Sequence, residues 1–243
     1  MNAISPIVKA RKYVESHTKL QAGTTKKKYV KNGLCLTISR QCGIDTGKIT
    51  EELVNYFNLF RKKDTGEWAT FDKNLIQKVL KDHELPTRLD KFIAEERMST
   101  MNEMLNELFK VHPPIMKLFH KTSSTILKLA EIGNVIIVGR AANIITNQLK
   151  NTFHIRLVAP LKVRIKNIQS SEKTTKKEAE KIIEHEDNSR RAYVSRHFHK
   201  DIDSPYNYHV IINVDKYDTK TLVETIGQMV IRKFPKYFEY KND

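Results

Sequence analysis

The most restrictive feature of this sequence is a run of four consecutive β-branched residues, Val135–Val138, that directly follows Gly133-Asn134. Such a run has no polar face, which is typical of a strand buried on both sides in a parallel sheet covered by helices. Further short segments with strand-like apolar patterns occur at 34–39, 68–71, 153–159 and 208–214. Segments with the apolar spacing of helices lie between and after them, at 47–57, 72–80, 89–109, 115–132, 141–149, 161–168, 171–195 (as one helix or two) and 219–234. We therefore expect an α/β fold with about five mostly parallel strands and helices on both faces.

The composition is that of a globular chain that folds without disulfides. Its 243 residues contain two cysteines, Cys35 and Cys42, which are too few for a disulfide framework and favour a reducing compartment. The longest apolar run is far shorter than the roughly 18 residues of a membrane span. Residues 1–17 carry charges and no apolar core, unlike a secretory signal. We therefore expect a cytoplasmic protein with no membrane partner.

The positive charge is concentrated at the N-terminus. The formal net charge is +15, and nearly half of it lies in residues 1–33, where eight basic residues accompany one acid. We interpret residues 1–33 as a basic N-terminal arm or helix and residues 34–243 as the folded domain. The apolar residues of the arm at helical spacing are Ile4, Ile7, Val8 and Val14. This apolar face either packs on the body or forms a contact between two copies of the chain. An oligomer formed through the arm is therefore one of two alternatives.

The charge also bears on the partner. A basic protein favours anionic partners, which include nucleotides, nucleic acids and acidic surfaces. The sequence has no arginine-rich or aromatic-interleaved patch, so small phosphorylated ligands are a better fit than nucleic acid. A nucleic-acid role for the arm is the weaker alternative, and it predicts steeply salt-dependent binding that is lost when residues 1–33 are removed.

The segment Ile38–Thr50 has the layout of a phosphate-binding loop. It runs from a strand through a loop with two glycines and a lysine into a helix, and ligands of parallel sheets bind at such strand ends. The strict pattern is G-x-x-x-x-G-K-[ST]. Here the spacing from Gly43 to Gly47 is one residue short, and Ile49 follows Lys48 where serine or threonine is expected. On its own the segment is a weak match, and an ordinary strand-to-helix turn is an equal alternative.

Residues 36–53 resemble the opening strand, loop and helix of the cytidylate kinase-like family, which typically reads I-S-R-x-x-G-S-G-G-x-x-I-A there. Further segments resemble the family in the same order. Residues 72–76 resemble its D-x-x-L-I, 135–143 its V-I-V-G-R-x-A-N, 156–164 its R-L-V-A-P-x-x-x-R, 187–191 its D-x-x-R and 208–213 its Y-D-L-V-I-N. The resemblance runs from about Leu34 to about Ile231 and leaves out the basic arm.

The resemblance implies a three-layer P-loop NTPase-like fold, in which residues 34–243 form a nucleotide-binding domain. In such nucleoside monophosphate kinases, a donor nucleotide lies over the first loop and an acceptor lies under an inserted helical region. A helical lid rich in arginine closes on both. The implied reaction transfers a phosphoryl group from ATP, with Mg²⁺, to CMP or a related monophosphate. Nucleotides are therefore the expected partners, and we expect no metal bound by side chains alone.

The resemblance also implies roles for particular residues. The catalytic candidates are Lys48, Arg140, Arg190, Arg191 and Arg196. The candidates for phosphate or nucleotide binding are Ser39, Arg40, Gly43, Thr46, Gly47 and Thr50. Arginines in such a lid neutralise charge on the transferring phosphoryl group. The alternatives are a surface ion pair for Arg140, and a solvated helix face for the lid arginines, with Glu186 spaced to pair with Arg190.

The loop departs from the family pattern. Ile44, Asp45 and Thr46 replace its S-G-G, so a negative charge enters the loop and two glycines that allow close backbone approach are lost. The loop lysine of cytidylate kinases aligns with Thr46, and Lys48 lies two residues later. We therefore expect slow phosphoryl transfer. The alternative is a nucleotide-binding module with little or no turnover that serves regulation or partner docking.

Overall fold

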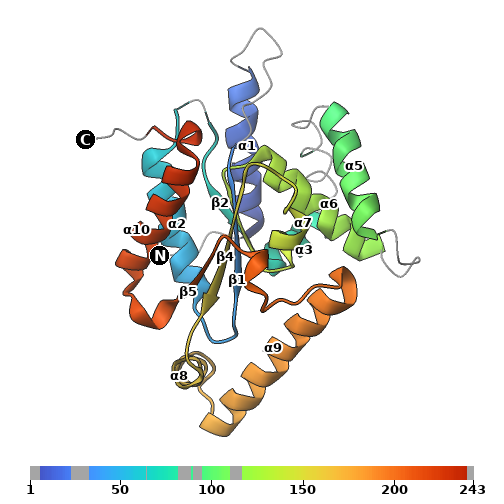
Figure 1. The fold of residues 1–243 in the computed structure, drawn as a ribbon. Helices are drawn as coiled ribbons and strands as arrows, with labels where there is room; N and C mark the ends of the chain where they lie inside the picture. Colours follow the sequence, from blue (N-terminus) through green and yellow to red (C-terminus); the bar gives the residue numbers. More distant parts are fainter. Residues whose placement is uncertain are drawn as a thin grey trace.

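The structure is a computed structural model, and it describes residues 6–22, 33–63, 65–81, 89, 95–109 and 117–239. Within these residues, five parallel strands form one sheet in the order β2-β3-β1-β4-β5 (Figure 1). The strands are β1 (Cys35–Arg40), β2 (Ala69–Phe71), β3 (Val135–Val138), β4 (Thr152–Val158) and β5 (Val210–Asn213). The expected α/β fold with a parallel sheet is confirmed.

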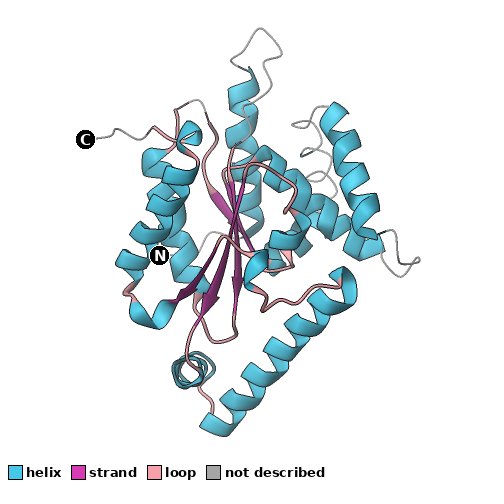
Figure 2. Cartoon of the chain, in the orientation of Figure 1, coloured by secondary structure: helices cyan, strands magenta, loops and turns pink. Residues whose placement is uncertain are grey.

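Helices cover both faces of the sheet (Figures 1 and 2). Helices α2 (Thr46–Phe60) and α10 (Thr219–Lys233) pack on one face. Helices α1 (Pro6–Ala22), α3 (Lys73–Lys81), α6 (Lys117–Ile132) and α7 (Ala142–Ile145) lie on the other, and α5 (Glu95–Phe109) packs against α6. Helices α8 (Leu161–Glu172) and α9 (Lys176–Phe198) lie beyond the carboxyl ends of the strands. Short 3-10 helices occur at Pro205–Asn207, Val214–Lys216 and Pro235–Tyr237. Across the described ranges, no helix combines the length and the hydropathy of a membrane-spanning segment.

The β-branched run that predicts a doubly buried strand forms β3, and all four of its residues are buried. Val135 and Ile137 contribute to the hydrophobic core on the α3 and α6 side of the sheet. Ile136 and Val138 contribute to the core under α2 and α10. The pairing of Ile38 with Val138 then brings the carboxyl ends of β1 and β3 to the same level of the sheet.

Two helical segments differ from their expected extents. The helix expected over 141–149 is the single turn α7, because the chain then turns and the Thr152 hydroxyl fixes that turn by donating to the Leu149 carbonyl at 2.9 Å. The segment 171–195, left open as one helix or two, holds one helix, α9, and its first two residues end α8, which runs past its expected end at residue 168. A break separates the two helices. The break lies before Thr175, whose hydroxyl accepts from the Glu178 amide while the Glu178 carboxylate accepts from the Thr175 amide.

Helix α1 packs on the body of the domain. Ala10, Tyr13 and Val14 are buried against α3 and β2. The Tyr13 hydroxyl donates to the Gly133 carbonyl at 2.6 Å, at the start of β3. Val14 lies on the buried face as expected, whereas Val8 is exposed. The described part of the arm is therefore a helix of the folded body.

The rest of the expected arm, including Ile4 and residues 23–32 with their lysine run, lies outside the described residues. Removing residues 1–33 would therefore also remove a helix that covers the core. A test of the basic arm for nucleic-acid binding needs charge-changing substitutions rather than this deletion.

Replacing Tyr13 by alanine is expected to lower the free energy of unfolding by about 3–5 kcal/mol, the usual cost of truncating a buried aromatic side chain. The variant loses the edge-to-face contact of Tyr13 with Phe71 and the hydrogen bond to the Gly133 carbonyl. Chemical denaturation followed by circular dichroism measures the change. Val8→Ala, on the exposed side of the same helix, is the control and should change stability by less than about 0.5 kcal/mol. Equal stability of the two variants would show that α1 does not belong to the core.

Candidate functional site

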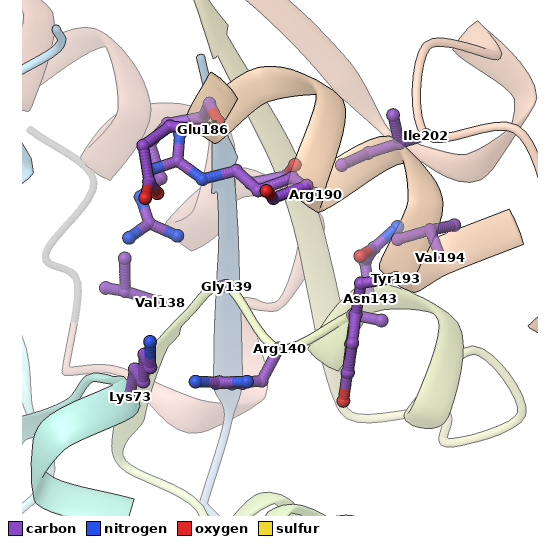
Figure 3. Close-up of a pocket in the computed structure, with 14 residues that line it drawn as sticks. Lys73, Val138, Gly139, Arg140, Asn143, Glu186, Arg190, Tyr193, Val194 and Ile202 are labelled. Carbon is purple, nitrogen blue, oxygen red and sulfur yellow. Dashed lines mark hydrogen bonds and ion pairs between the residues drawn. The ribbon is translucent and has the colours of Figure 1, made fainter. Parts of the chain in front are cut away.

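A cavity of about 350 Å³ lies where β1 and β3 end, between the turn after β3 and helix α9 (Figure 3). Its position agrees with the rule that parallel sheets bind ligands at the carboxyl ends of their strands. The side chains and backbone that line it belong to Ser39, Arg40, Lys73, Val138, Gly139, Arg140, Ala141, Asn143, Glu186, Ser189, Arg190, Tyr193, Val194 and Ile202.

The turn after β3 is strained in a way that directs Arg140 into the cavity. Gly139, Arg140 and Ala141 have φ angles of 76, 56 and 54°, so three successive residues are left-handed. Outside glycine this conformation costs about 1–2 kcal/mol per residue. The Gly139 amide donates to the Ile38 carbonyl at 2.9 Å, which ties the turn to β1. A side chain at Gly139 is impossible without movement, because its Cβ would lie 2.3 Å from a guanidinium nitrogen of Arg40.

One end of the cavity carries a cluster of positive charge, formed by Arg40, Lys73, Arg140 and Arg190. In Figure 3 the charged ends of Lys73 and Arg140 point into the same open space. Burial and the nearby charge of Arg190 lower the pKa of Arg40 to about 10. Guanidinium groups held close together in a partly buried place favour an anion that offers several oxygens, such as a phosphate.

The other end of the cavity is aromatic and apolar. Tyr193, Val194 and Ile202 line it, together with the amide side chain of Asn143 (Figure 3). The guanidinium of Arg140 lies 5.7 Å from the centre of the Tyr193 ring, and burial raises the pKa of the Tyr193 phenol. The cavity thus combines an anion-binding end with a flat, neutral surface on which a ring can pack.

The neighbouring loop holds carboxylates of the chain itself. Asp45 caps α2, and its carboxylate accepts hydrogen bonds from the amides of Gly47 and Lys48 at 3.0 and 3.4 Å. The amide of Cys42 donates to the carboxylate of Asp187 in α9 at 2.8 Å. Backbone amides at such a position are the groups that bind phosphates in a working phosphate loop. In this chain they donate to Asp45 and Asp187 instead.

A buried ion pair fixes that arrangement. Arg164 of α8 donates to the other carboxylate oxygen of Asp187 at 2.8 Å, and both side chains are about nine-tenths buried. Arg164 also donates to the Cys42 carbonyl at 3.3 Å, and Asn167 donates to the Gly43 carbonyl at 2.8 Å. A Cβ on Gly43 would lie 2.7 Å from the carbonyl oxygen of Arg164. The loop therefore packs directly on α8 and is joined to α9 through Asp187.

The structure brings together part of the expected site. Ser39, Arg40, Arg140 and Arg190 all line the cavity. The loop residues Gly43, Thr46, Gly47, Lys48 and Thr50 do not line it and lie in the loop or the first turns of α2. Lys48 is exposed, whereas Thr50 is buried and donates its hydroxyl hydrogen to the Gly47 carbonyl at 3.1 Å.

The three lid arginines have different surroundings. Arg190 is partly buried, donates to the Arg40 carbonyl at 3.3 Å and pairs with Glu186 at 3.4 Å, as the spacing predicts. Arg191 donates to the carboxylate of Asp203 at 2.8 Å and does not line the cavity. Arg196 is exposed on α9, also away from the cavity. Of the three, Arg190 alone lines the cavity, and a catalytic role for Arg191 and Arg196 stays a prediction.

Sequence reasoning missed Lys73, Glu186 and Tyr193. Lys73 follows the helix cap Asp72, whose carboxylate accepts from the Leu75 amide at 2.8 Å, and it reaches the cavity because β2 pairs with β3. That pairing is not evident from the order of the segments in the chain. Glu186 lies four residues before Arg190 and Tyr193 lies three residues after it. The helical repeat therefore places both on the same face of the helix as Arg190, which is a signal that the sequence contains.

Comparison with known proteins bears on the family and the fold. The sequence model of the cytidylate kinase-like family matches residues 35–216, about three quarters of the chain. A crystal structure of an uncharacterized protein from Eubacterium ventriosum ATCC 27560 is similar, with a TM-score of 0.65 and 17% sequence identity over 83% of this chain and 99% of that chain. At this identity the likeness concerns the fold alone. No curated protein matches the sequence.

Replacing Asp187 by alanine is expected to lower the free energy of unfolding by about 3–5 kcal/mol, because it leaves the buried charge of Arg164 without its partner. Replacing the pair together, by Arg164→Met with Asp187→Leu, should cost much less than the single change. Urea denaturation of the three proteins measures the difference. Glu186→Ala, at the half-exposed neighbouring position, is the matched control and should cost under about 1 kcal/mol. A loss in Asp187→Ala no larger than in this control would contradict a structural role for the pair.

Proposed function

Because the chain belongs to the cytidylate kinase-like family, we propose that it binds a nucleoside monophosphate in the cavity and transfers phosphoryl groups to it slowly at best. The contrast between the cavity and the adjacent loop supports both the binding and the slow transfer. Cationic side chains gather at the ends of β1 and β3, while the amides of the adjacent loop donate to Asp45 and Asp187.

The form of the cavity favours a monophosphate. A volume of about 350 Å³ is at the lower end of the range for small-molecule sites, which is roughly 300–1,000 Å³. The phosphate fits the end with Arg40, Arg140 and Arg190, where planar guanidinium groups can donate to its oxygens. The base or sugar fits the end with Tyr193 and Ile202. CMP is the nucleotide that the family resemblance implies, and it is the first ligand to test.

The loop residues do not fit ATP with Mg²⁺. The carboxylate of Asp45 accepts from the two amides that a phosphate would need, and its charge opposes a triphosphate. The Thr50 hydroxyl, which would have to replace the missing serine or threonine as a ligand of Mg²⁺, is buried and bonded within the helix. Lys48 is exposed. Binding with little turnover is therefore the better proposal than rapid transfer.

Arg140→Met is expected to weaken CMP binding by about 10- to 100-fold, on the scale of a lost hydrogen bond to a charged group. Isothermal titration calorimetry of the full-length protein measures the Kd. Arg196→Met is the matched control, because Arg196 is a cation outside the cavity, and its Kd should stay within twofold of the unmodified protein. A Kd for CMP that is unmeasurable in the unmodified protein, or equal losses in both variants, would count against the site.

Relieving the loop is expected to admit the donor nucleotide. Asp45→Asn, which keeps the helix cap without its charge, and Asp45→Gly should each tighten ATP binding by about tenfold. Thr46→Lys, which restores the lysine at its aligned position, should raise the rate of CDP formation from ATP and CMP. CMP affinity should not change in any of the three. Conversion of CMP by the unmodified protein at about 1–100 s⁻¹, the usual range for kinases, would show that this loop is competent.

A further inference from the structure

A buried arginine that the proposed function does not use lies behind the cavity. Arg156 in β4 is 4% exposed, and one end of its guanidinium donates to the Ser39 hydroxyl oxygen at 2.9 Å. The other end forms an ion pair with Asp203. The Tyr208 ring lies 5.7 Å from the guanidinium carbon. Arg156 does not line the cavity, but its neighbour Ser39 does, so Ser39 connects the two.

These contacts determine which way the Ser39 hydroxyl can hydrogen bond. A guanidinium has donors only, so the Ser39 oxygen must accept from Arg156, and the hydroxyl hydrogen must find another partner. Among the described residues, the other hydroxyl contact of Ser39 is with the Tyr208 hydroxyl, whose oxygen lies 3.4 Å away. This is longer than an O–H···O bond of about 2.5–3.0 Å. The Tyr208 hydrogen itself is directed to the Ile202 carbonyl at 2.7 Å. The Ser39 hydrogen is thus left without a good acceptor in the protein.

We propose that Arg156 is a positioning residue that makes Ser39 a hydrogen-bond donor to a phosphate oxygen of the ligand. This inference rests on the proposed binding of a monophosphate in the cavity. Because the Ser39 oxygen already accepts from Arg156 while its hydrogen has no good acceptor in the protein, the hydroxyl gains most from a ligand group that accepts a hydrogen bond. Ser39 therefore adds a neutral, directional donor to the charged groups of Arg40 and Arg140, and favours a fully ionised phosphate.

Asp203 and Arg191 hold Arg156 in place. The Asp203 carboxylate pairs with Arg156 and accepts from Arg191 of α9 at 2.8 Å. Partial burial raises the pKa of Asp203, but the hydrogen bonds from Arg191 and Arg156 outweigh it and keep the pKa below its usual value. The segment around Asp203 also supplies Ile202 to the cavity. In this structure Arg191 anchors this segment through Asp203.

The first part of the test concerns Ser39, with CMP and inorganic phosphate as separate probes in calorimetric titrations of the full-length protein. Ser39→Ala should weaken binding of both probes by about tenfold, because the missing hydrogen bond is made to a charged acceptor. Ser39→Thr keeps the hydroxyl and should restore the affinity to within about threefold. An unchanged Kd in Ser39→Ala, in a protein that binds CMP, would overturn this inference and leave the proposed function intact. Absence of CMP binding in the unmodified protein would overturn both.

The second part separates positioning from a structural role. Arg156→Met should weaken CMP binding by about fivefold in the unmodified background and by less than twofold when combined with Ser39→Ala, since its effect passes through Ser39. Arg156→Lys keeps a cationic donor and should recover most of the loss. Tyr208→Phe, which keeps the ring and removes the phenol oxygen, should leave the Kd within twofold.

Additive losses in the double variant, or no recovery with lysine, would show that Arg156 acts on the fold alone. If Arg156→Met does not fold, the lysine variant and the two Ser39 variants still decide the matter.

Discussion

The carboxylate of Asp187 is the group on which the arrangement of the site depends. A buried carboxylate must keep its hydrogen-bond partners, and Asp187 finds them in Arg164 of α8 and in the amide of Cys42. These bonds join α8, α9 and the end of β1 at one place. Helix α9 is therefore held over the strand ends, and the face that carries Glu186 and Arg190 becomes a wall of the cavity. Loss of this carboxylate would affect the loop and the cavity together.

The same bonds explain why two neighbouring places that suit an anion differ in character. At the loop, the anions are supplied by the chain, since Asp45 and Asp187 accept the amide hydrogens that a phosphate would require. In the cavity, the charge of Arg190 acts on Arg40, and Lys73 and Arg140 line the same space, while Arg190 also pairs with Glu186 at 3.4 Å and with Asp187 at 3.6 Å. Binding an external anion there relieves repulsion between cations, whereas at the loop it would add repulsion between anions. The electrostatics thus favour a phosphate in the cavity over a phosphate on the loop.

The fold and part of the site follow from local sequence patterns. The β-branched run predicts β3, and a residue that directly follows a buried strand, such as Arg140, is expected at the ligand edge of a parallel sheet. Lys73 could not be placed in this way, because its position depends on β2 pairing with β3. The partner of Arg191 was equally out of reach, because Asp203 is brought back to α9 by a loop with no periodic pattern. The sequence shows that Asp45 brings a negative charge that opposes a phosphate. Only the structure shows that its carboxylate accepts hydrogen bonds from the loop amides.

In the proposed function, binding and transfer are separable because they rest on different elements. Arg140 is directed by the strained turn after β3, and Ser39 is oriented by Arg156 from β4, so neither depends on the residues that replace the loop glycines. The loop can lose its affinity for a triphosphate while the strand ends keep a complete set of donors for a monophosphate. What remains shared is Asp187, which closes the loop and also holds α9 in position. A change that opens the loop at Asp45 therefore preserves the cavity, whereas one that opens it at Asp187 removes the wall on which the proposed monophosphate binding depends.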